Sequence, residues 1–262
     1  MLKYFYGVMG ASKSTHALMA YYDFIGLSNE QAPTFLLKPS VDTRTSWAAQ
    51  SPQTQTQTQT QTAPSSPALP APISSRGDLT YGTVSSRTGL YSDCVLFSPA
   101  DSLDTILYYL LTASTTPGWL TRLTHCRIVI DEAQFCTPAQ VDELRAIADL
   151  GATVYCYGLK NTFKNQLFPG AKRLLELADE IAEIPHLCRC GQKAIYNLRI
   201  VTNKATGTRR ILTAGEDIQI SDPDSANTTA DTDDYTVTYE SLCPDCASSL
   251  RQVRAPDEEA LY

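Results

Sequence analysis

A short loop of small residues near the start of the sequence constrains this chain more than any other feature. Residues 2–8 predict a short buried strand, and the apolar pattern of residues 17–22 predicts a helix. Between them stands the segment Gly7-Val8-Met9-Gly10-Ala11-Ser12-Lys13-Ser14-Thr15. A strand, such a loop ending in Lys-Ser, and a helix are typical of a P-loop, where backbone N–H groups hold a phosphate, the Lys reaches the outer phosphates and the hydroxyl holds Mg²⁺. We therefore expect residues 7–15 to bind a nucleotide phosphate.

The loop departs from the usual P-loop pattern at one position. Ser12 stands where the second glycine belongs. That glycine allows a backbone conformation and a close approach of phosphate that a β-carbon hinders. A small-residue turn between a strand and a helix, without a ligand, is the alternative interpretation.

An acidic pair follows a second apolar strand. Residues 127–130 are Arg-Ile-Val-Ile, and Asp131-Glu132-Ala133-Gln134 follow them. This pattern resembles a Walker B element, in which Asp131 helps to hold Mg²⁺ and Glu132 stands where a general base belongs. The alternative is an acidic strand end before a helix that Thr137 caps. Because two nucleotide-binding motifs occur in the expected order, the functional interpretation is favoured.

Strands and helices alternate over most of the chain. Strands are predicted at 32–39, 93–97, 127–130 and 152–157, and helices at 103–111 and 171–178. This alternation predicts an α/β fold with a P-loop NTPase-like, mainly parallel sheet flanked by helices. We assign residues 1–185 to this nucleotide-binding domain. Asp42 and Arg44 come just after a strand, where ligand contacts gather in open α/β sheets, although they also suit a plain charged turn.

A low-complexity insertion interrupts this domain. Residues 46–75 contain repeated Gln-Thr dipeptides followed by a tract rich in Pro, Ala and Ser. Such a segment cannot bury enough apolar surface to offset the entropy of ordering, so we expect it to be disordered.

Two close pairs of cysteines lie near the end of the chain. Cys188 and Cys190 form one pair, and Cys243 and Cys246 form the other. Four thiolates can close one tetrahedral, structural Zn²⁺ site, although a disulfide pair or free thiols would also fit the spacing. Alternating segments between the pairs predict a small β-rich zinc lobe at 186–254, and we expect 255–262 to be a flexible tail.

Charge and hydropathy restrict the partners of the chain. The formal net charge is −7, so we expect no nucleic-acid polymer as its main ligand. The sequence has no long apolar run and no signal-peptide pattern, so we expect no membrane span and a cytoplasmic protein.

Taken together, these motifs resemble the type II, zinc-containing thymidine kinases, and most closely their enterobacterial members. The matching segments occur in the family's order and cover nearly all of the chain outside the insertion: 7–15, Lys38-Pro39 with Asp42-Thr43-Arg44, Val84-Ser85-Ser86-Arg87, 131–135, Tyr157-Gly158-Leu159 with Phe163, Phe168-Pro169-Gly170, and the four cysteines. The run 215–234 lacks the Ile-Gly-Gly segment of the family, and Lys160 stands where many members carry Asp.

The resemblance implies transfer of the ATP γ-phosphate to the 5′-hydroxyl of thymidine or deoxyuridine, with Glu132 as the general base. It assigns the ATP contacts to residues 7–15 and 131–134. It associates Mg²⁺ with Ser14, Asp42 and Asp131. It assigns the nucleoside contacts to Met9, Arg44, Phe135, Leu159, Phe163 and Tyr239. It also implies a homo-oligomer, either a dimer or a tetramer.

Two other functions fit parts of the sequence. Because of Ser12, the chain could be a catalytically weakened nucleotide-binding protein of the same fold. The Asp-Glu-Ala-Gln segment also resembles a helicase box, but the chain is too short for two motor domains and its net charge does not suit nucleic acid.

Overall fold

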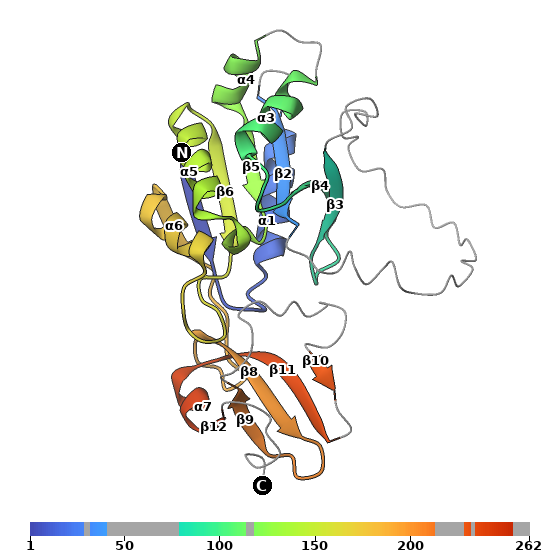
Figure 1. Cartoon of the computed structure of the whole chain (residues 1–262), viewed down its shortest axis with the longest axis vertical. Coiled ribbons are helices and arrows are strands. Elements are labelled where there is room, and N and C mark those ends of the chain that lie inside the picture. The colour runs from blue at the N-terminus through green and yellow to red at the C-terminus, as the bar shows by residue number, and fades with distance from the viewer. Residues whose placement is uncertain (29–31, 41–78, 114–117, 213–227, 232–233, 254–262) are drawn as a thin grey trace, which may run out of the picture.

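The polypeptide folds into two β-sheets that lie end to end. The computed structural model describes residues 1–28, 32–40, 79–113, 118–212, 228–231 and 234–253. Figure 1 shows a large sheet with helices around it and, below it, a smaller sheet formed by the last third of the chain. Several predictions fall outside the described residues: Asp42, Arg44, the insertion at 46–75 and the tail at 255–262.

The large sheet has seven strands in the order β3-β4-β2-β5-β6-β1-β7. All neighbouring pairs are parallel except β3 with β4, which is antiparallel. The predicted mainly parallel α/β sheet is therefore confirmed. Its strands are β1 (Leu2–Tyr6), β2 (Thr34–Pro39), β3 (Thr80–Ser85), β4 (Tyr91–Phe97), β5 (Arg127–Ile130), β6 (Thr153–Gly158) and β7 (Glu180–Glu183).

Helices cover both faces of this sheet because successive side chains of a strand point to opposite faces. On β5, Ile128 and Ile130 belong to one buried cluster, while Val129 belongs to another. The first cluster is completed by α3 (Leu103–Thr112), α4 (Trp119–His125), α5 (Pro138–Asp149) and α6 (Pro169–Leu177). The second is completed by α1 (Lys13–Gly26). These apolar layers hold the strand ends that carry the acidic pair and the phosphate loop.

Polar caps determine where two of the helices begin. The Thr137 hydroxyl accepts a hydrogen bond from the backbone N–H of Gln140, whose side chain accepts one from the N–H of Thr137. This reciprocal pair satisfies two donors that a helix start leaves open, and it confirms the predicted cap. The Ser102 side chain caps α3 in a similar way. The sequence interpretation missed α4, a helix of seven residues that begins at Trp119.

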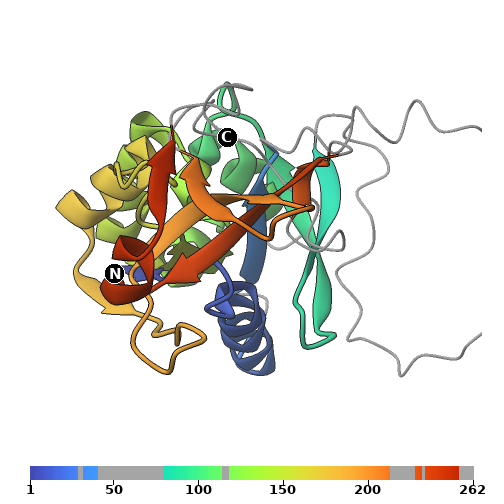
Figure 2. The same ribbon diagram turned by 90° about the horizontal axis from the view of Figure 1, so that it is seen from below.

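The small sheet has five strands in the order β10-β11-β8-β9-β12. They are β8 (Tyr196–Asn203), β9 (Arg209–Leu212), β10 (Thr228–Asp231), β11 (Tyr235–Leu242) and β12 (Arg251–Val253), and α7 (Pro244–Ser248) follows β11. We call residues 187–212, 228–231 and 234–253 the small lobe. Figure 2 shows this sheet from below, in front of the large sheet. The predicted β-rich character is confirmed, whereas the domain boundaries at 185 and 254 stay a prediction.

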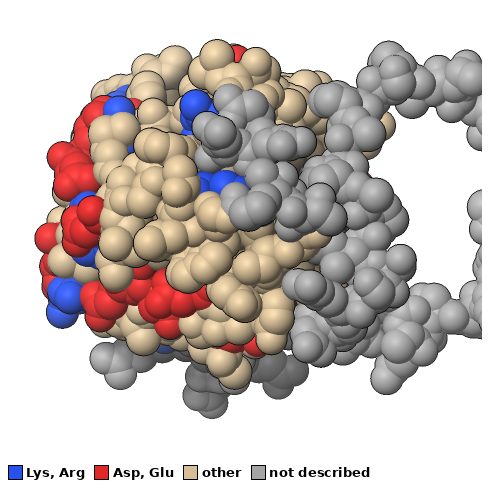
Figure 3. All heavy atoms as spheres, turned by 90° about the horizontal axis from the view of Figure 1, so that it is seen from above, with Lys and Arg blue, Asp and Glu red and all other residues tan. Residues whose placement is uncertain are grey.

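The surface carries both signs of charge. On the face in Figure 3, acidic side chains gather along one flank, with Lys and Arg side chains between them. Ion pairs among the described residues include Arg173 with Asp142 and Arg145 with Asp149. Among the described residues, no helix combines the length and the apolar character needed to cross a membrane.

Candidate active site

The phosphate loop joins the end of β1 to the start of α1 through two residues with left-handed backbone. Gly10 has φ of +81° and Ser12 has φ of 57°. An L-residue with a β-carbon is strained in this region by roughly 1–2 kcal/mol, whereas glycine is not. The structure thus gives the physical reason why glycine is usual at the position of Ser12.

The backbone N–H groups of the loop divide into two sets. Those of Gly7, Met9 and Ala11 donate to Gly158 O, Asn197 Oδ1 and Val8 O. For the N–H groups of Gly10 and Ser12, the described part of the chain contains no acceptor. The first backbone N–H groups of a helix have no acceptor within the helix. The start of α1 therefore offers further donors beside those of Gly10 and Ser12. These groups are available as donors to a bound phosphate, and phosphate binding by residues 7–15 stays a prediction.

Lys13 is buried against the same loop. Its Nζ donates to Val8 O at 2.8 Å, which leaves two of the three ammonium donors for other acceptors. Burial lowers the pKa of Lys13, while the carboxylates of Glu132 and Asp131 oppose this effect. The charged form of Lys13 is therefore favoured by the carboxylates of the acidic pair.

Asp131 lies at the carboxyl end of β5 and is 3% exposed. Burial, together with the neighbouring carboxylate of Glu132, raises the pKa of Asp131 above its ordinary value, and a hydrogen bond from Ser14 opposes the rise. The predicted Mg²⁺-associated residues Ser14 and Asp131 thus lie close together. A carboxylate beside a hydroxyl is a donor set that suits a hard cation such as Mg²⁺.

Glu132 follows with φ of 56°, so its backbone is also left-handed. Its Oε2 accepts a hydrogen bond of 2.6 Å from Gln134 Nε2, and Gln134 Oε1 accepts one of 2.9 Å from Leu159 N. A β-carbon on Gly158 would lie 2.6 Å from Gln134 Oε1, so only glycine leaves room for this amide. The side chain of Gln134 therefore orients Glu132, a role that sequence reasoning missed.

Ala133 and Gln134 are almost completely buried, at 0% and 1% exposure. They lie in a short 3-10 helix, η1 (Ala133–Phe135), under the loop that follows β6. Their predicted contact with ATP stays a prediction.

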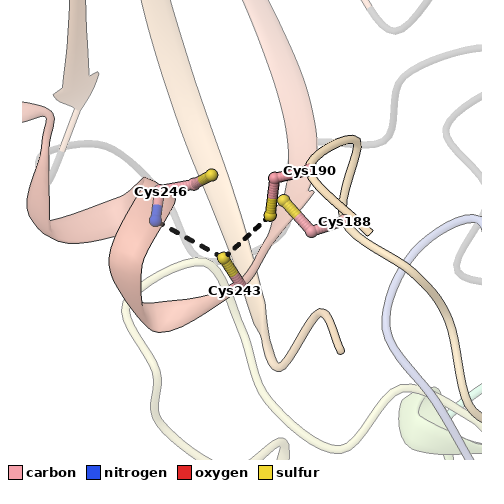
Figure 4. Close-up of side chains that lie close together, drawn as sticks. All are labelled: Cys188, Cys190, Cys243 and Cys246. Carbon is pink, nitrogen blue, oxygen red and sulfur yellow. Dashed lines mark hydrogen bonds between the residues drawn. The ribbon is translucent and has the colours of Figure 1, made fainter. Parts of the chain in front are cut away.

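The four cysteines of the two pairs converge in the small lobe, as Figure 4 shows. Their Sγ atoms all lie within 4.8 Å of one another, and Cys190 Sγ lies 3.5 Å from Cys243 Sγ. Zn–S bonds of about 2.3 Å in a tetrahedron require sulfur atoms about 3.8 Å apart, so this cluster fits a structural zinc ion. All four are free thiols, and N–H groups of Cys190 and Cys243 lower the pKa of Cys188 to about 7, which favours the thiolate. The other four cysteines, Cys94, Cys126, Cys136 and Cys156, are buried.

Comparison with known proteins agrees with this geometry. The thymidine kinase family model matches residues 113–221. The thymidine kinase of Legionella pneumophila (strain Paris) is 32% identical over 203 residues, which are 77% of this chain and 76% of that protein. The chain belongs to the thymidine kinase family. A thymidine kinase of Rhodopirellula baltica is 30% identical over 84% of this chain and 80% of its own length, and one of Yersinia pestis is 43% identical over 45% and 57%.

Thymidine kinases must also hold a nucleoside, and the structure brings some of the predicted contacts together. Met9 and Tyr239 line a cavity of about 320 Å³ between the phosphate loop and the small lobe. The Tyr239 ring packs edge-on against Phe163, with 6.3 Å between the centroids. Arg87 and His186 also line this cavity. Sequence reasoning did not assign either of them, although the Val-Ser-Ser-Arg segment contains Arg87.

Phe135 and Leu159 pack against the large core and are not among the residues that line this cavity. The Phe135 ring packs edge-on against Phe168 at 5.6 Å. Their contact with nucleoside stays a prediction, as does that of Arg44, which lies outside the described residues.

Proposed function

We propose that this member of the thymidine kinase family transfers the γ-phosphate of ATP to the 5′-hydroxyl of thymidine or deoxyuridine. One observation carries the proposal: Lys13, Ser14 and Glu132 all lie near enough to Asp131, at the end of β5, to influence its pKa. This set supplies a cation, a Mg²⁺-binding pair and a base, which are the groups that phosphoryl transfer needs.

In the proposed reaction, Glu132 accepts the proton of the 5′-hydroxyl. The nucleoside oxygen forms a bond to the γ-phosphorus, and the bond from this phosphorus to the bridging oxygen breaks, so that ADP leaves with the electron pair. Mg²⁺, held by Ser14 and Asp131, would neutralise charge on the phosphates. Lys13 and the free N–H groups of Gly10 and Ser12 orient the γ-phosphate for in-line attack. Gln134 keeps the Glu132 carboxylate aimed at the hydroxyl.

The proposal includes the rest of the predicted organisation. Residues 1–185 form the kinase domain, and residues 186–254 form a lobe that a structural Zn²⁺ stabilises. A reducing cytoplasm suits four free thiols around a metal. The family resemblance supports a homo-oligomer, with two or four copies of the chain.

A coupled assay of ADP release, with ATP, Mg²⁺ and each nucleoside in turn, tests the proposal. We expect turnover with thymidine and deoxyuridine and none with purine nucleosides. A Ser12→Gly variant run beside the wild type tests the effect of the strained loop. If only this variant turns over, the natural chain is a weakened kinase. If neither variant phosphorylates any nucleoside, the proposed function is wrong.

A further inference from the structure

Two side chains of the small lobe hold one residue of the phosphate loop. Asn197 Oδ1 accepts a hydrogen bond of 2.7 Å from Met9 N, and Ser241 Oγ donates one of 2.6 Å to Met9 O. Both backbone groups of Met9 are therefore bonded to the small lobe. We call this pair of contacts the Met9 clamp.

The clamp is built into the small sheet. Asn197 on β8 and Ser241 on β11 are directly opposite each other in the antiparallel register, so their side chains lie on the same face. Ser241 Oγ lies 3.4 Å from Asn197 Oδ1, and Asn197 Nδ2 donates to Asn161 O at 3.3 Å. Asn197 is 4% exposed, so its amide is satisfied by these partners and not by water.

Apolar packing supports the same junction. The Val8 side chain packs against the buried cluster of the small lobe, which contains Cys188, Leu242 and Cys243. Ser241 is two residues before Cys243, and Asn197 is seven residues after Cys190. The clamp residues thus lie on β8 and β11, the two strands that adjoin the cysteine cluster in the sequence.

We propose that the Met9 clamp holds the phosphate loop in its ATP-binding conformation, so that the small lobe and its metal set the affinity for ATP. The Met9 N–H is bonded to Asn197, whereas the next residue, Gly10, has φ of +81° and an N–H with no acceptor among the described residues. Fixing the backbone of a loop costs roughly 1–2 kcal/mol per residue, and a contact that fixes it beforehand removes this cost from ligand binding. Asn197 and Ser241 are positioning residues, because they act through Met9.

ATP binding measured by calorimetry, without turnover, tests the proposal. We expect Asn197→Ala and Ser241→Ala each to raise the Kd for ATP by about 5- to 10-fold, the usual effect of one lost hydrogen bond. Ser241→Thr keeps the hydroxyl and is expected to bind ATP within about twofold of the wild type. Thr238→Val is a matched control, since it removes a hydroxyl from the other face of β11. Unchanged affinity in both alanine variants, with full zinc content, would overturn the proposal.

Steady-state kinetics separate positioning from general damage. In the alanine variants we expect KM for ATP to rise while kcat at saturating ATP stays within about threefold, since Glu132 is not touched. A fall in kcat with unchanged KM would contradict the clamp.

Hydrogen exchange at the Met9 amide gives a readout that needs neither ATP nor turnover. We expect this amide to exchange at least about tenfold faster in Asn197→Ala, and unchanged exchange would count against the clamp. The inference rests on the proposed ATP site, but its failure is distinguishable. If the wild type binds ATP and phosphorylates no nucleoside, the proposed function is wrong. The measurements of ATP affinity and of hydrogen exchange at the Met9 amide would still test the clamp.

Discussion

The two sheets of this protein hold their functional side chains by different physical means. In the large sheet, seven strands lie between apolar layers, and apolar packing on both faces supports the ends of β1 and β5. The small sheet has a buried cluster that includes Cys188 and Cys243 themselves. A lobe with so small a core needs a further constraint, and the proposed zinc ion would supply it. The site therefore rests on a large apolar core on one side and on a lobe with a four-cysteine cluster on the other.

The largest expected effect is the unfolding of the small lobe while the large sheet stays folded. Cys243→Ser removes one zinc ligand from a residue that is also buried, and structural zinc contributes on the order of 10 kcal/mol in small domains. Hydrogen exchange should show lost protection in β8 and β11 and retained protection in β5 and β6. Cys136→Ala, which removes a buried thiol from the large core, is the control and should keep a full equivalent of zinc. Simultaneous loss of protection in both sheets would contradict the comparison.

An isosteric substitution of the proposed base should leave both sheets folded and greatly reduce phosphoryl transfer. Glu132→Gln keeps the shape of the side chain but cannot accept the proton, so we expect kcat to fall by about 10²–10⁴-fold with ATP affinity nearly unchanged. Single-turnover kinetics would measure this. Glu180→Gln, at an exposed acid of β7, is the control and should keep kcat within about twofold. Turnover of Glu132→Gln at the rate of the control would show that another group is the base.

Strain in the phosphate loop gives a smaller effect on the large sheet. Ser12→Gly should raise the free energy of unfolding by about 1 kcal/mol, because glycine adopts the left-handed conformation without a clash. Ala11→Gly is the matched control. Its backbone is not left-handed, so the same change should lower stability. Denaturant titration would measure the free energy of unfolding of both variants. A lower value for Ser12→Gly than for the wild type would show that the serine is unstrained.

The smallest effect concerns an ion pair that ties β1 to the chain before β7. Asp179 accepts from Leu2 N at 2.6 Å and pairs with Arg145 at 2.9 Å. The backbone bond and Arg145 lower the pKa of Asp179, so this carboxylate stabilises the fold above its unfolded pKa, and the contribution disappears as pH falls through the lower folded value.

We therefore expect Asp179→Asn to cost up to about 1 kcal/mol at pH 7 and almost nothing in acid, because the group is partly exposed. Asp149→Asn, whose partner is the same Arg145, is the control and should cost less, since Asp149 has no described bond to a backbone N–H. Unfolding curves at several pH values would measure both. An equal cost at low and neutral pH would contradict the role of the charge.

The local patterns of the sequence predicted much of this protein correctly. The phosphate loop, the apolar strand before Asp131, the Thr137 cap and the two cysteine pairs are each recognised within a few residues, since their physics is local. The alternation of strands and helices predicted the parallel sheet, because such strands need helical crossovers. The short helix α4 was missed, since seven residues carry too little periodicity to recognise.

Contacts between distant residues were decided only by the tertiary structure. Gln134 reaches Glu132 two residues away only because Leu159, 25 residues on, holds the other end of its amide. Likewise, Asn197 and Ser241 lie 188 and 232 residues from Met9 in the sequence, and only the packing of the small lobe against the loop brings them together. The sequence alone identifies the residue types that could bind a phosphate, a metal ion or a proton. Their orientation depends on hydrogen bonds between segments whose separation along the chain carries no local pattern.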